Sequence, residues 1–143
     1  MTKIKEEVLQ FLKGRPECVL ATLSPDGKPE AATVLFAVDD EFTFYFGTSE
    51  KYRKYQNLLK NRQAAIVVGV MASDPRSAQI EGEMEPITEE ADVVKTKEFF
   101  TERNPAMKPF LNWPLKFFRL KPTWLRFLDE TKGSEENFQQ IIP

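Results

Sequence analysis

The sequence predicts an α+β domain, mainly β, built around an antiparallel sheet or barrel of about six strands. Short runs rich in β-branched and aromatic residues are separated by tight turns, and a few amphipathic segments are inserted between them. No internal repeat, low-complexity tract or linker divides the 143 residues. We therefore expect a single domain over residues 1–143.

The first predicted elements are a helix and three strands. Residues 3–13 place apolar side chains on one helical face, and Gly14 and Pro16 end that helix. The runs CVLATL, EAATVLFAV and FTFYF follow, separated by the turn segments SPDGK and DD. Because short turns join neighbouring antiparallel strands, these runs predict a three-stranded meander.

The middle of the chain is predicted to contain a helix and two strands. Residues 50–61 carry apolar side chains at helical spacing. The run AAIVVGVM (64–71) is apolar at every position but one, which indicates a central strand covered on both faces. The next run, AQIEGEME, alternates, so Ile80 and Met84 are expected to face the core.

The C-terminal part is predicted to hold one more helix and the closing strand. Thr88 suits the N-cap of a helix that reaches about Arg103, and Asn104 with the following proline ends it. PAMKPFLNWP is expected to be irregular. FFRLKPTWLRFLD indicates one long strand, or two joined at Pro122, and the tail after Asp129 is expected to be loose.

The composition excludes several classes of function. Twenty basic and 22 acidic residues give a net charge of −2, so a nucleic-acid partner is not expected and any anion site must be local. The absence of histidine excludes Ser-His-Asp and Cys-His catalysis and histidine-based metal or haem ligation, and no metal site is expected. Any difficult chemistry is therefore expected to belong to a bound cofactor.

The expected location is the cytoplasm. Cys18 is the only cysteine, so no internal disulfide can form, and its apolar surroundings favour a core residue over a nucleophile. The first residues carry acids within their apolar pattern, which is typical of neither a signal peptide nor a membrane span.

The stretch YFGTSEKYRK (45–54) suggests an anion site. A strand ends in a glycine and two hydroxyl residues, one of which can cap the following helix. Each positive charge near a helix N-terminus costs about 0.3–1 kcal/mol, and a bound phosphate would reverse that sign. The alternative is an ordinary cap with a solvated basic face. The residues that could surround a phosphate are Thr48, Ser49, Lys51, Arg53 and Lys54.

The succession VLATLSPDGKPEAATVLFAVDDEFTFYFGTSEKYRKYQNLLKN resembles the pyridoxamine phosphate oxidase-like group of FMN-binding split barrels. That family commonly shows Y-F-x-T-S-x-x-S-x-K-x-x-N-L after two strands, and YFGTSEKYRKYQNL follows the pattern. RSAQIEGEMEPI and FFRLKPTWLRFLD resemble its later strands. The resemblance spans roughly residues 8–130 and implies a six-stranded antiparallel split β-barrel with peripheral helices.

The resemblance also implies a place for each part of FMN. Lys54 would neutralise the phosphate, with Arg53, Thr48 and Ser49 completing the cradle. At position 52 this chain has Tyr52 where the family usually has a small hydroxyl residue, which removes one phosphate ligand.

The isoalloxazine ring would lie along the backbone of Thr33, Val34 and Leu35, and Gln79 would reach the ring or the ribityl chain. In this family the site lies at a homodimer interface, so the second subunit is expected to supply a wall. The wall is assigned to Phe110, Asn112 and Trp113. The alternative for the two aromatic residues is that they plug the core or an end of the barrel.

Other departures separate the chain from vitamin-salvage enzymes. Ala31 and Ala32 stand where true pyridoxamine phosphate oxidases use a basic residue, and the C-terminal strand lacks their Arg-x-His substrate grip. The chain looks closer to a small bacterial branch of the family. The lack of histidine argues against the haem-handling relatives.

The resemblance implies an FMN-dependent oxidoreductase that acts on an unidentified small molecule, with NADH or NADPH as electron donor. No proton donor is identified; Lys51, Tyr52 and Tyr55 are candidates by type alone. Three alternatives keep the fold: a deazaflavin-dependent reductase, a non-catalytic flavin-binding or flavin-sensing protein, and a dimeric scaffold without a ligand. The deazaflavin cofactor has an acidic tail, which would need a further basic groove.

Overall fold

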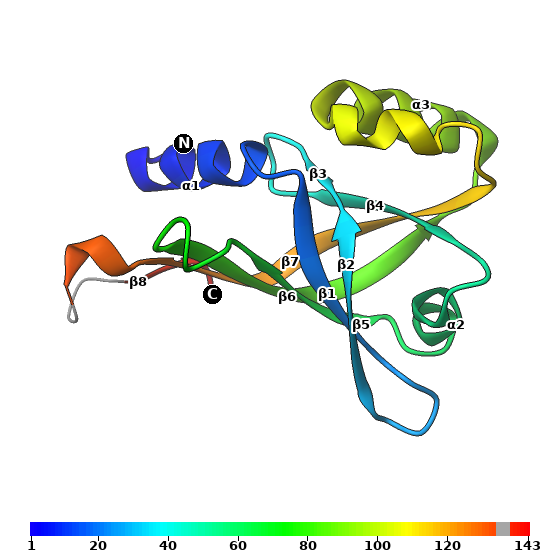
Figure 1. The fold of residues 1–143 in the computed structure, drawn as a ribbon, viewed down its shortest axis with the longest axis horizontal. Helices are drawn as coiled ribbons and strands as arrows, with labels where there is room; N and C mark the ends of the chain where they lie inside the picture. The colour runs from blue at the N-terminus through cyan, green and yellow to red at the C-terminus, as the bar shows by residue number, and fades with distance from the viewer. Residues whose placement is uncertain (134–137) are drawn as a thin grey trace.

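The computed structural model describes residues 1–133 and 138–143. In the described chain, one curled antiparallel sheet of eight strands carries helices at its periphery (Figure 1). The strands are β1 (Glu17–Leu23), β2 (Pro29–Leu35), β3 (Ala37–Val38), β4 (Phe44–Ser49), β5 (Gln63–Val68), β6 (Arg76–Ile87), β7 (Leu115–Asp129) and β8 (Phe138–Ile142). The helices are α1 (Lys3–Lys13), α2 (Arg53–Lys60), α3 (Glu90–Arg103) and the 3₁₀ turns η1 (Pro105–Phe110) and η2 (Glu130–Lys132).

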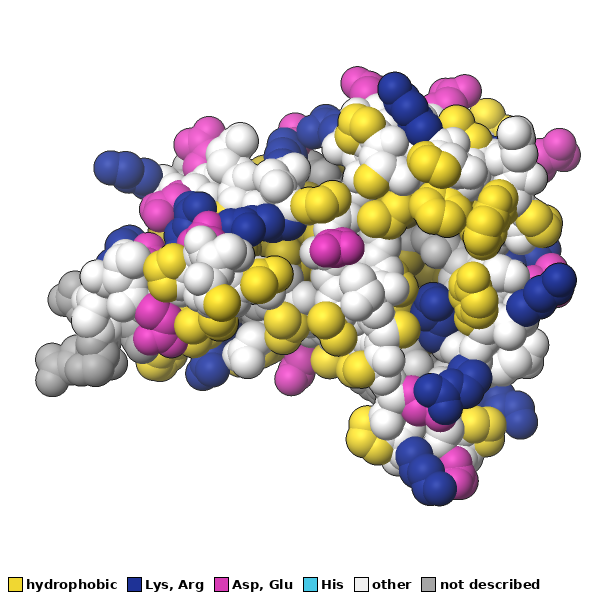
Figure 2. Space-filling view, viewed as in Figure 1, with side chains coloured by type: hydrophobic (Ala, Val, Ile, Leu, Met, Phe, Trp, Pro, Cys, Tyr) yellow, Lys and Arg dark blue, Asp and Glu magenta, His cyan; other side chains and the backbone are white. Residues whose placement is uncertain are grey.

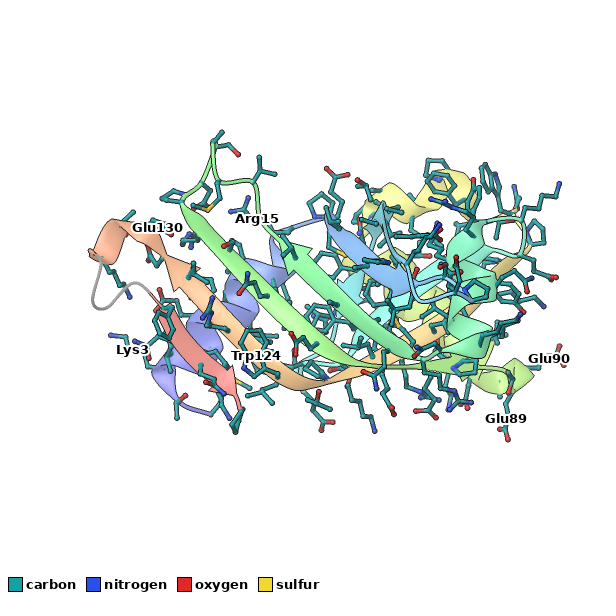
Figure 3. The ribbon with its side chains drawn as sticks, turned by 90° about the horizontal axis from the view of Figure 1, so that it is seen from below. Lys3, Arg15, Glu89, Glu90, Trp124 and Glu130 are labelled. Atoms are coloured by element: carbon teal, nitrogen blue, oxygen red, sulfur yellow. The ribbon has the colours of Figure 1, made fainter. Side chains whose placement is uncertain are left out.

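The predicted mainly-β antiparallel split barrel is confirmed, with two more strands than expected. The strand order is β2-β1-β5-β6-β7-β4-β3. β8 lies off this path and pairs with residues 125–128 of β7, beyond the residues that pair with β4. The two extra strands are the two-residue β3 and the C-terminal β8. The tail was predicted to be loose, which is wrong for Phe138–Ile142, because this segment hydrogen-bonds along β7 (Figure 3). Residues 134–137 of that tail lie outside the described residues.

The predicted meander divides at Phe36. The run EAATVLFAV forms two strands, and β2 and β3 lie at opposite edges of the sheet. Phe36 itself is buried, its amide donates to the carbonyl of Pro16, and its carbonyl accepts from the Asn104 side chain. These bonds take its backbone out of the sheet, so the chain crosses from one edge to the other at this residue.

The two longest strands form the spine of the molecule. β6 and β7 pair from Arg76–Asp129 to Ile87–Phe117, with a register shift at Gly82. The segment around Pro122 therefore belongs to one continuous strand, and the irregular pairing opposite it accommodates a residue that has no backbone N–H. Figure 3 shows this spine running between the ends marked by Glu89 and Glu130.

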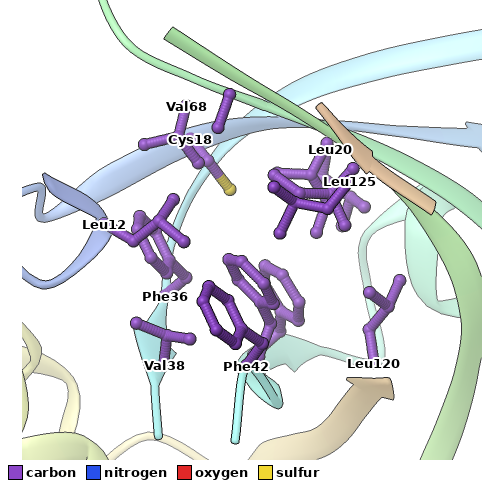
Figure 4. Packing of buried hydrophobic residues seen from close by; sticks show 14 of the residues in the cluster. Leu12, Cys18, Leu20, Phe36, Val38, Phe42, Val68, Leu120 and Leu125 are labelled. Carbon is purple, nitrogen blue, oxygen red and sulfur yellow. The ribbon is translucent and has the colours of Figure 1, made fainter. Parts of the chain in front are cut away.

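The main core lies inside the curled sheet. Leu12 from α1, Phe36, and strand residues such as Leu20, Leu120 and Leu125 are almost fully buried there, and Figure 4 shows their side chains around one interior. Ile80 and Met84 face this core, as predicted from the alternation in β6. Cys18 is also buried in the cluster, as its predicted core role implies, and this burial raises the pKa of its thiol.

A second core lies under α3 and η1 on the outer face of the sheet. Phe100 and Met107 pack there against Ile87 and Phe117. The helix begins at Glu90 with Glu89 as its N-cap, so the predicted cap at Thr88 is wrong by one residue. The irregular stretch expected after Asn104 contains the six-residue 3₁₀ helix η1.

The buried Asn104 holds this second layer in place. Its Nδ2 donates to the carbonyls of Pro16 (2.7 Å) and Phe36 (2.9 Å), and its Oδ1 accepts from the amide of Ala106 (3.2 Å). One amide group therefore connects the start of β1, the break after β2 and the start of η1.

One expectation about β5 is wrong. Its burial alternates, and Val67 leaves 41% of its surface exposed, as does Val19 beside it with 43%. Within this chain, the described residues cover only one face of the strand. None of the helices in the described residues combines the length and apolar character needed to span a bilayer.

We predict that Leu58→Ala lowers the free energy of unfolding by about 2–5 kcal/mol, because it leaves a cavity in the main core. Leu58 is 3% exposed, whereas its neighbour Leu59 is 53% exposed and serves as the matched control. Urea unfolding followed by circular dichroism measures both; Leu59→Ala should stay within about 0.5 kcal/mol of wild type. Equal losses in the two variants would contradict the burial pattern of α2.

Candidate functional site

The connection between β4 and α2 differs from the predicted cap. Thr48 and Ser49 complete β4, opposite Lys116 and Leu115, and α2 begins only at Arg53. The N-cap residue makes no side-chain hydrogen bond. The predicted cap by a hydroxyl residue is therefore wrong, because both hydroxyl residues belong to the strand.

The turn after β4 is short and ordered by backbone bonds. The Ser49 hydroxyl accepts from the amide of Lys51 at 3.2 Å, and the amide of Tyr52 donates to the carbonyl of Ser49 at 3.2 Å. Ser49 still has its own hydroxyl proton to donate. The buried Thr48 hydroxyl makes only a long bond, 3.4 Å, to the carbonyl of Ser49.

A cleft of about 180 Å³ opens at this turn. Its walls come from the ends of β2 and β4, the start of α2, and η1 with the loop after it. Figure 2 shows hydrophobic side chains gathered below α3 with Lys and Arg side chains next to them. Seven of the predicted cofactor-binding residues line the cleft: Thr33, Val34, Leu35, Thr48, Ser49, Lys54 and Trp113.

Lys54 provides the positive charge of the cleft. Its ammonium lies 4.3 Å from the centroid of the Tyr52 ring, and no acidic partner for it is found among the described residues. Burial lowers the pKa of Lys54. A partly desolvated cation without a counter-ion favours an anionic ligand, because such a ligand restores the lost solvation.

Two aromatic side chains, those of Phe110 and Trp113, form another part of the wall. The rings of Phe110 and Trp113 meet edge to face, with centroids 5.0 Å apart. Trp113 stays exposed in the cleft, so it does not plug the core. Both rings belong to the same chain as Lys54, and this wall therefore forms without a second subunit. Asn112, assigned to the same wall, is exposed and does not line the cleft.

Arg53 lies outside this cleft. Its guanidinium is 2.9 Å from the carboxylate of Glu30, in a neighbouring hollow of about 300 Å³. The hollow also contains Lys51 and shares Tyr52 and Lys54 with the cleft. Of the basic residues in the predicted cradle, Arg53 therefore lines the hollow but not the cleft, whereas Lys54 lines both spaces.

Gln79 is also apart from the cleft. It lies on β6, accepts a hydrogen bond from Arg126 at 3.1 Å, and belongs to the cross-strand row Thr33–Val19–Val67–Gln79. Three strand spacings separate it from Thr33, about 14 Å. One chain therefore does not bring Gln79 to the ligand space beside Thr33.

The structure also locates the candidates for a proton donor. Tyr52 lines the cleft, whereas the Tyr55 ring packs on Phe118, with centroids 6.0 Å apart, against the main core. The described residues hold no group of three Asp, Glu or Cys side chains arranged to bind a metal ion.

Sequence reasoning missed some of the wall. Gly47, Phe100, Met107 and Leu115 line the cleft, and apolar residues carry no chemical signature that separates a cleft wall from a core. Glu30 was missed as well. Its position opposite Thr22 is a cross-strand pairing that the structure shows.

Comparison with known proteins identifies relatives in sequence and in fold. The family model for pyridoxamine 5'-phosphate oxidase matches residues 4–129. A pyridoxine/pyridoxamine 5'-phosphate oxidase of Trichormus variabilis is 41% identical over 70 residues, which are 49% of this chain and 32% of that enzyme. The match thus spans about a third of the enzyme's length.

Solved structures share the fold at lower identity. A conserved hypothetical protein of Mycobacterium tuberculosis superposes with a TM-score of 0.74 at 22% identity, over 92% of this chain and 87% of that one. A heme binding protein of Mycobacterium smegmatis gives 0.79 at 17% identity, over 99% of this chain and 59% of that one. These likenesses show the fold.

We predict that the stability of the ligand-free wild type rises, relative to that of Lys54→Met, as the pH approaches 10.5, the ordinary pKa of a lysine side chain. The lowered pKa makes folded Lys54 lose its proton before the unfolded chain does, and stability rises wherever the unfolded state binds more protons. Urea unfolding over a pH series measures this difference. Lys60→Met, at an exposed lysine of α2, is the matched control. Parallel pH profiles for wild type and Lys54→Met would contradict the burial of the ammonium.

Proposed function

Because the chain belongs to the pyridoxamine 5'-phosphate oxidase family, we propose that it binds FMN in the cleft beside Lys54 and acts as a flavin-dependent oxidoreductase on a small molecule. One observation carries the proposal. The cleft is lined by an ammonium that has no acidic partner among the described residues, by an exposed tryptophan and by the strand segment Thr33–Leu35. FMN has groups that match this lining, a phosphate on a flexible chain that ends in a flat aromatic ring.

The residues of the cleft suit the parts of FMN. Lys54 and the Ser49 hydroxyl are the donors at the phosphate end. The segment Thr33–Leu35 offers backbone groups along the ring, and Trp113 offers an aromatic face or edge. Bound FMN would supply two-electron redox chemistry, and the chain would hold the ring and exclude water from one side.

We propose a homodimer, in which a second copy covers the exposed face of β1 and β5. Val19 and Val67 stand directly opposite each other there, and Thr33 continues their row into the cleft. In a two-fold dimer the same surface meets itself in reverse order. An axis near the two valines would place Gln79 of the second copy close to Thr33, where Gln79 was expected to contact the flavin.

The structure favours FMN over a deazaflavin with an acidic tail. Such a tail would need a further basic groove beside Lys54. The neighbouring hollow contains Lys51 and Arg53, but Glu30 already neutralises Arg53. A haem cofactor is disfavoured because the sequence has no histidine to ligate the iron.

We predict that the purified protein takes up FMN and that Lys54→Met weakens this binding by about 10- to 100-fold, the worth of a charge-assisted contact to phosphate. Fluorescence titration with FMN measures the affinity, and Lys60→Met is the matched control. A wild-type protein that rejects FMN would overturn the proposal, and an unchanged affinity in Lys54→Met would remove Lys54 from the site.

A second measurement separates an enzyme from a flavin-binding protein. The FMN-loaded protein is mixed with NADH or NADPH without oxygen, and the flavin absorbance is followed. We expect bleaching, followed by recovery when an oxidising substrate from a panel is added. Loaded protein that neither donor reduces would indicate a binding or sensing role.

We predict that Val67→Asp converts the dimer to a monomer and weakens FMN binding, because it buries a charge in the proposed interface. Light scattering after size-exclusion chromatography measures the mass. Val94→Asp alters a valine on α3 that is 50% exposed, against 41% for Val67, and should leave the mass unchanged. A wild-type monomer, or a dimer that survives Val67→Asp, would contradict this interface.

A further inference from the structure

A buried polar network ties α2 to the β1–β2 hairpin. Thr22 and Glu30 are directly opposite each other on the two strands. The buried Asn57 donates through Nδ2 to Thr22 Oγ1 at 3.0 Å and to Glu30 Oε1 at 2.7 Å. Because one amide reaches both strands, the network holds α2, and Lys54 with it, at a defined place beside the hairpin.

The second carboxylate oxygen of Glu30 forms an ion pair with Arg53. Glu30 Oε2 lies 2.9 Å from Arg53 Nη1, and Arg53 precedes Asn57 by one helical turn. The Glu30 side chain is only 19% exposed, whereas that of Arg53 is 77% exposed. The carboxylate is thus the more buried partner, and it holds the guanidinium in the hollow, which Lys54 also lines but Phe110 and Trp113 do not.

We propose that Glu30 is a specificity-determining residue that keeps Arg53 away from the phosphate, so that Lys54 is the cation that meets it. This inference rests on the proposed function. A second cation at the phosphate would tighten binding of every phosphate-bearing ligand and would favour ligands with longer anionic tails. With Arg53 held by Glu30, the site suits a ligand with one terminal phosphate.

Glu30→Gln separates the two roles of this side chain. The amide oxygen of glutamine can still accept from Asn57, so the tie to α2 remains. The negative charge is lost, and Arg53 is free to turn toward the cleft. A purely structural role for Glu30 therefore predicts no change in phosphate affinity, whereas the proposal predicts a gain.

The test compares FMN with riboflavin, which lacks the phosphate, in wild type, Glu30→Gln, Arg53→Met and the double variant. We expect Glu30→Gln to bind FMN about tenfold more tightly, the worth of one added charge-assisted contact, with riboflavin affinity unchanged. The gain should disappear in the double variant and should fall with added salt. Arg53→Met alone should change FMN binding little.

Two results would overturn the inference. One is an Arg53→Met variant that loses as much FMN affinity as Lys54→Met, since Arg53 would then already contact the phosphate. The other is a Glu30→Gln variant that binds FMN no more tightly than wild type, or whose FMN and riboflavin affinities change equally.

A measurement without flavin keeps this test separate from the proposed function. Inorganic phosphate is titrated while the thermal unfolding midpoint is recorded. If no variant binds FMN, the proposed function fails. The inference about Glu30 still stands if phosphate stabilises Glu30→Gln more than the double variant, and it fails if phosphate stabilises both equally.

Discussion

The candidate site depends on one buried amide, that of Asn104. Its three hydrogen bonds join the start of β1, the break at Phe36 and the first residues of η1. The break sends the chain from one edge of the sheet to the other, and η1 carries Met107 and Phe110 to the end of β2. The cleft therefore exists because a layer outside the sheet is fastened to the point where the strands separate. A fully bonded amide in such a place costs little, whereas a missing one would take a donor from the carbonyls of Pro16 and Phe36, and the Pro16 carbonyl would keep only the longer bond from the Phe36 amide.

The chemistry of the cleft comes from how the structure distributes charge. The chain as a whole is almost neutral, with a net charge of −2, yet Lys54 forms no ion pair with any described residue. The adjacent Arg53 is paired with Glu30, although both cations lie in the first turn of α2. Which cation is paired with a carboxylate, rather than the number of basic residues, thus decides whether Arg53 or Lys54 can bind an anion. Because α2 is tied through Asn57 to the hairpin that carries Glu30, this choice is built into the fold.

The sheet uses its two faces differently. The inner face closes over the main core, while the outer face is covered by α3 and η1 at one end and left open around Val19 and Val67. An open row of β-branched side chains next to a cleft is the arrangement expected where a second copy completes a site. The same row connects Thr33, which lines the cleft, with Gln79, which does not.

The local pattern of the sequence determined the mainly-β class, the inward face of β6 and the core role of Cys18, because alternation and turn residues act over a few neighbours. Most of the predicted cleft residues came from the resemblance to the split-barrel family, which the YFGTSEKYRK segment and its flanking strands carry. Only the tertiary structure decided that Phe36 divides a strand, that the face of β5 is open, and that the tail adds a strand to β7. It also separated Arg53 from Lys54, which are adjacent in sequence. Such outcomes depend on partners distant in the chain, such as Asn104 for Phe36 and Glu30 for Arg53, and local periodicity contains no information about them.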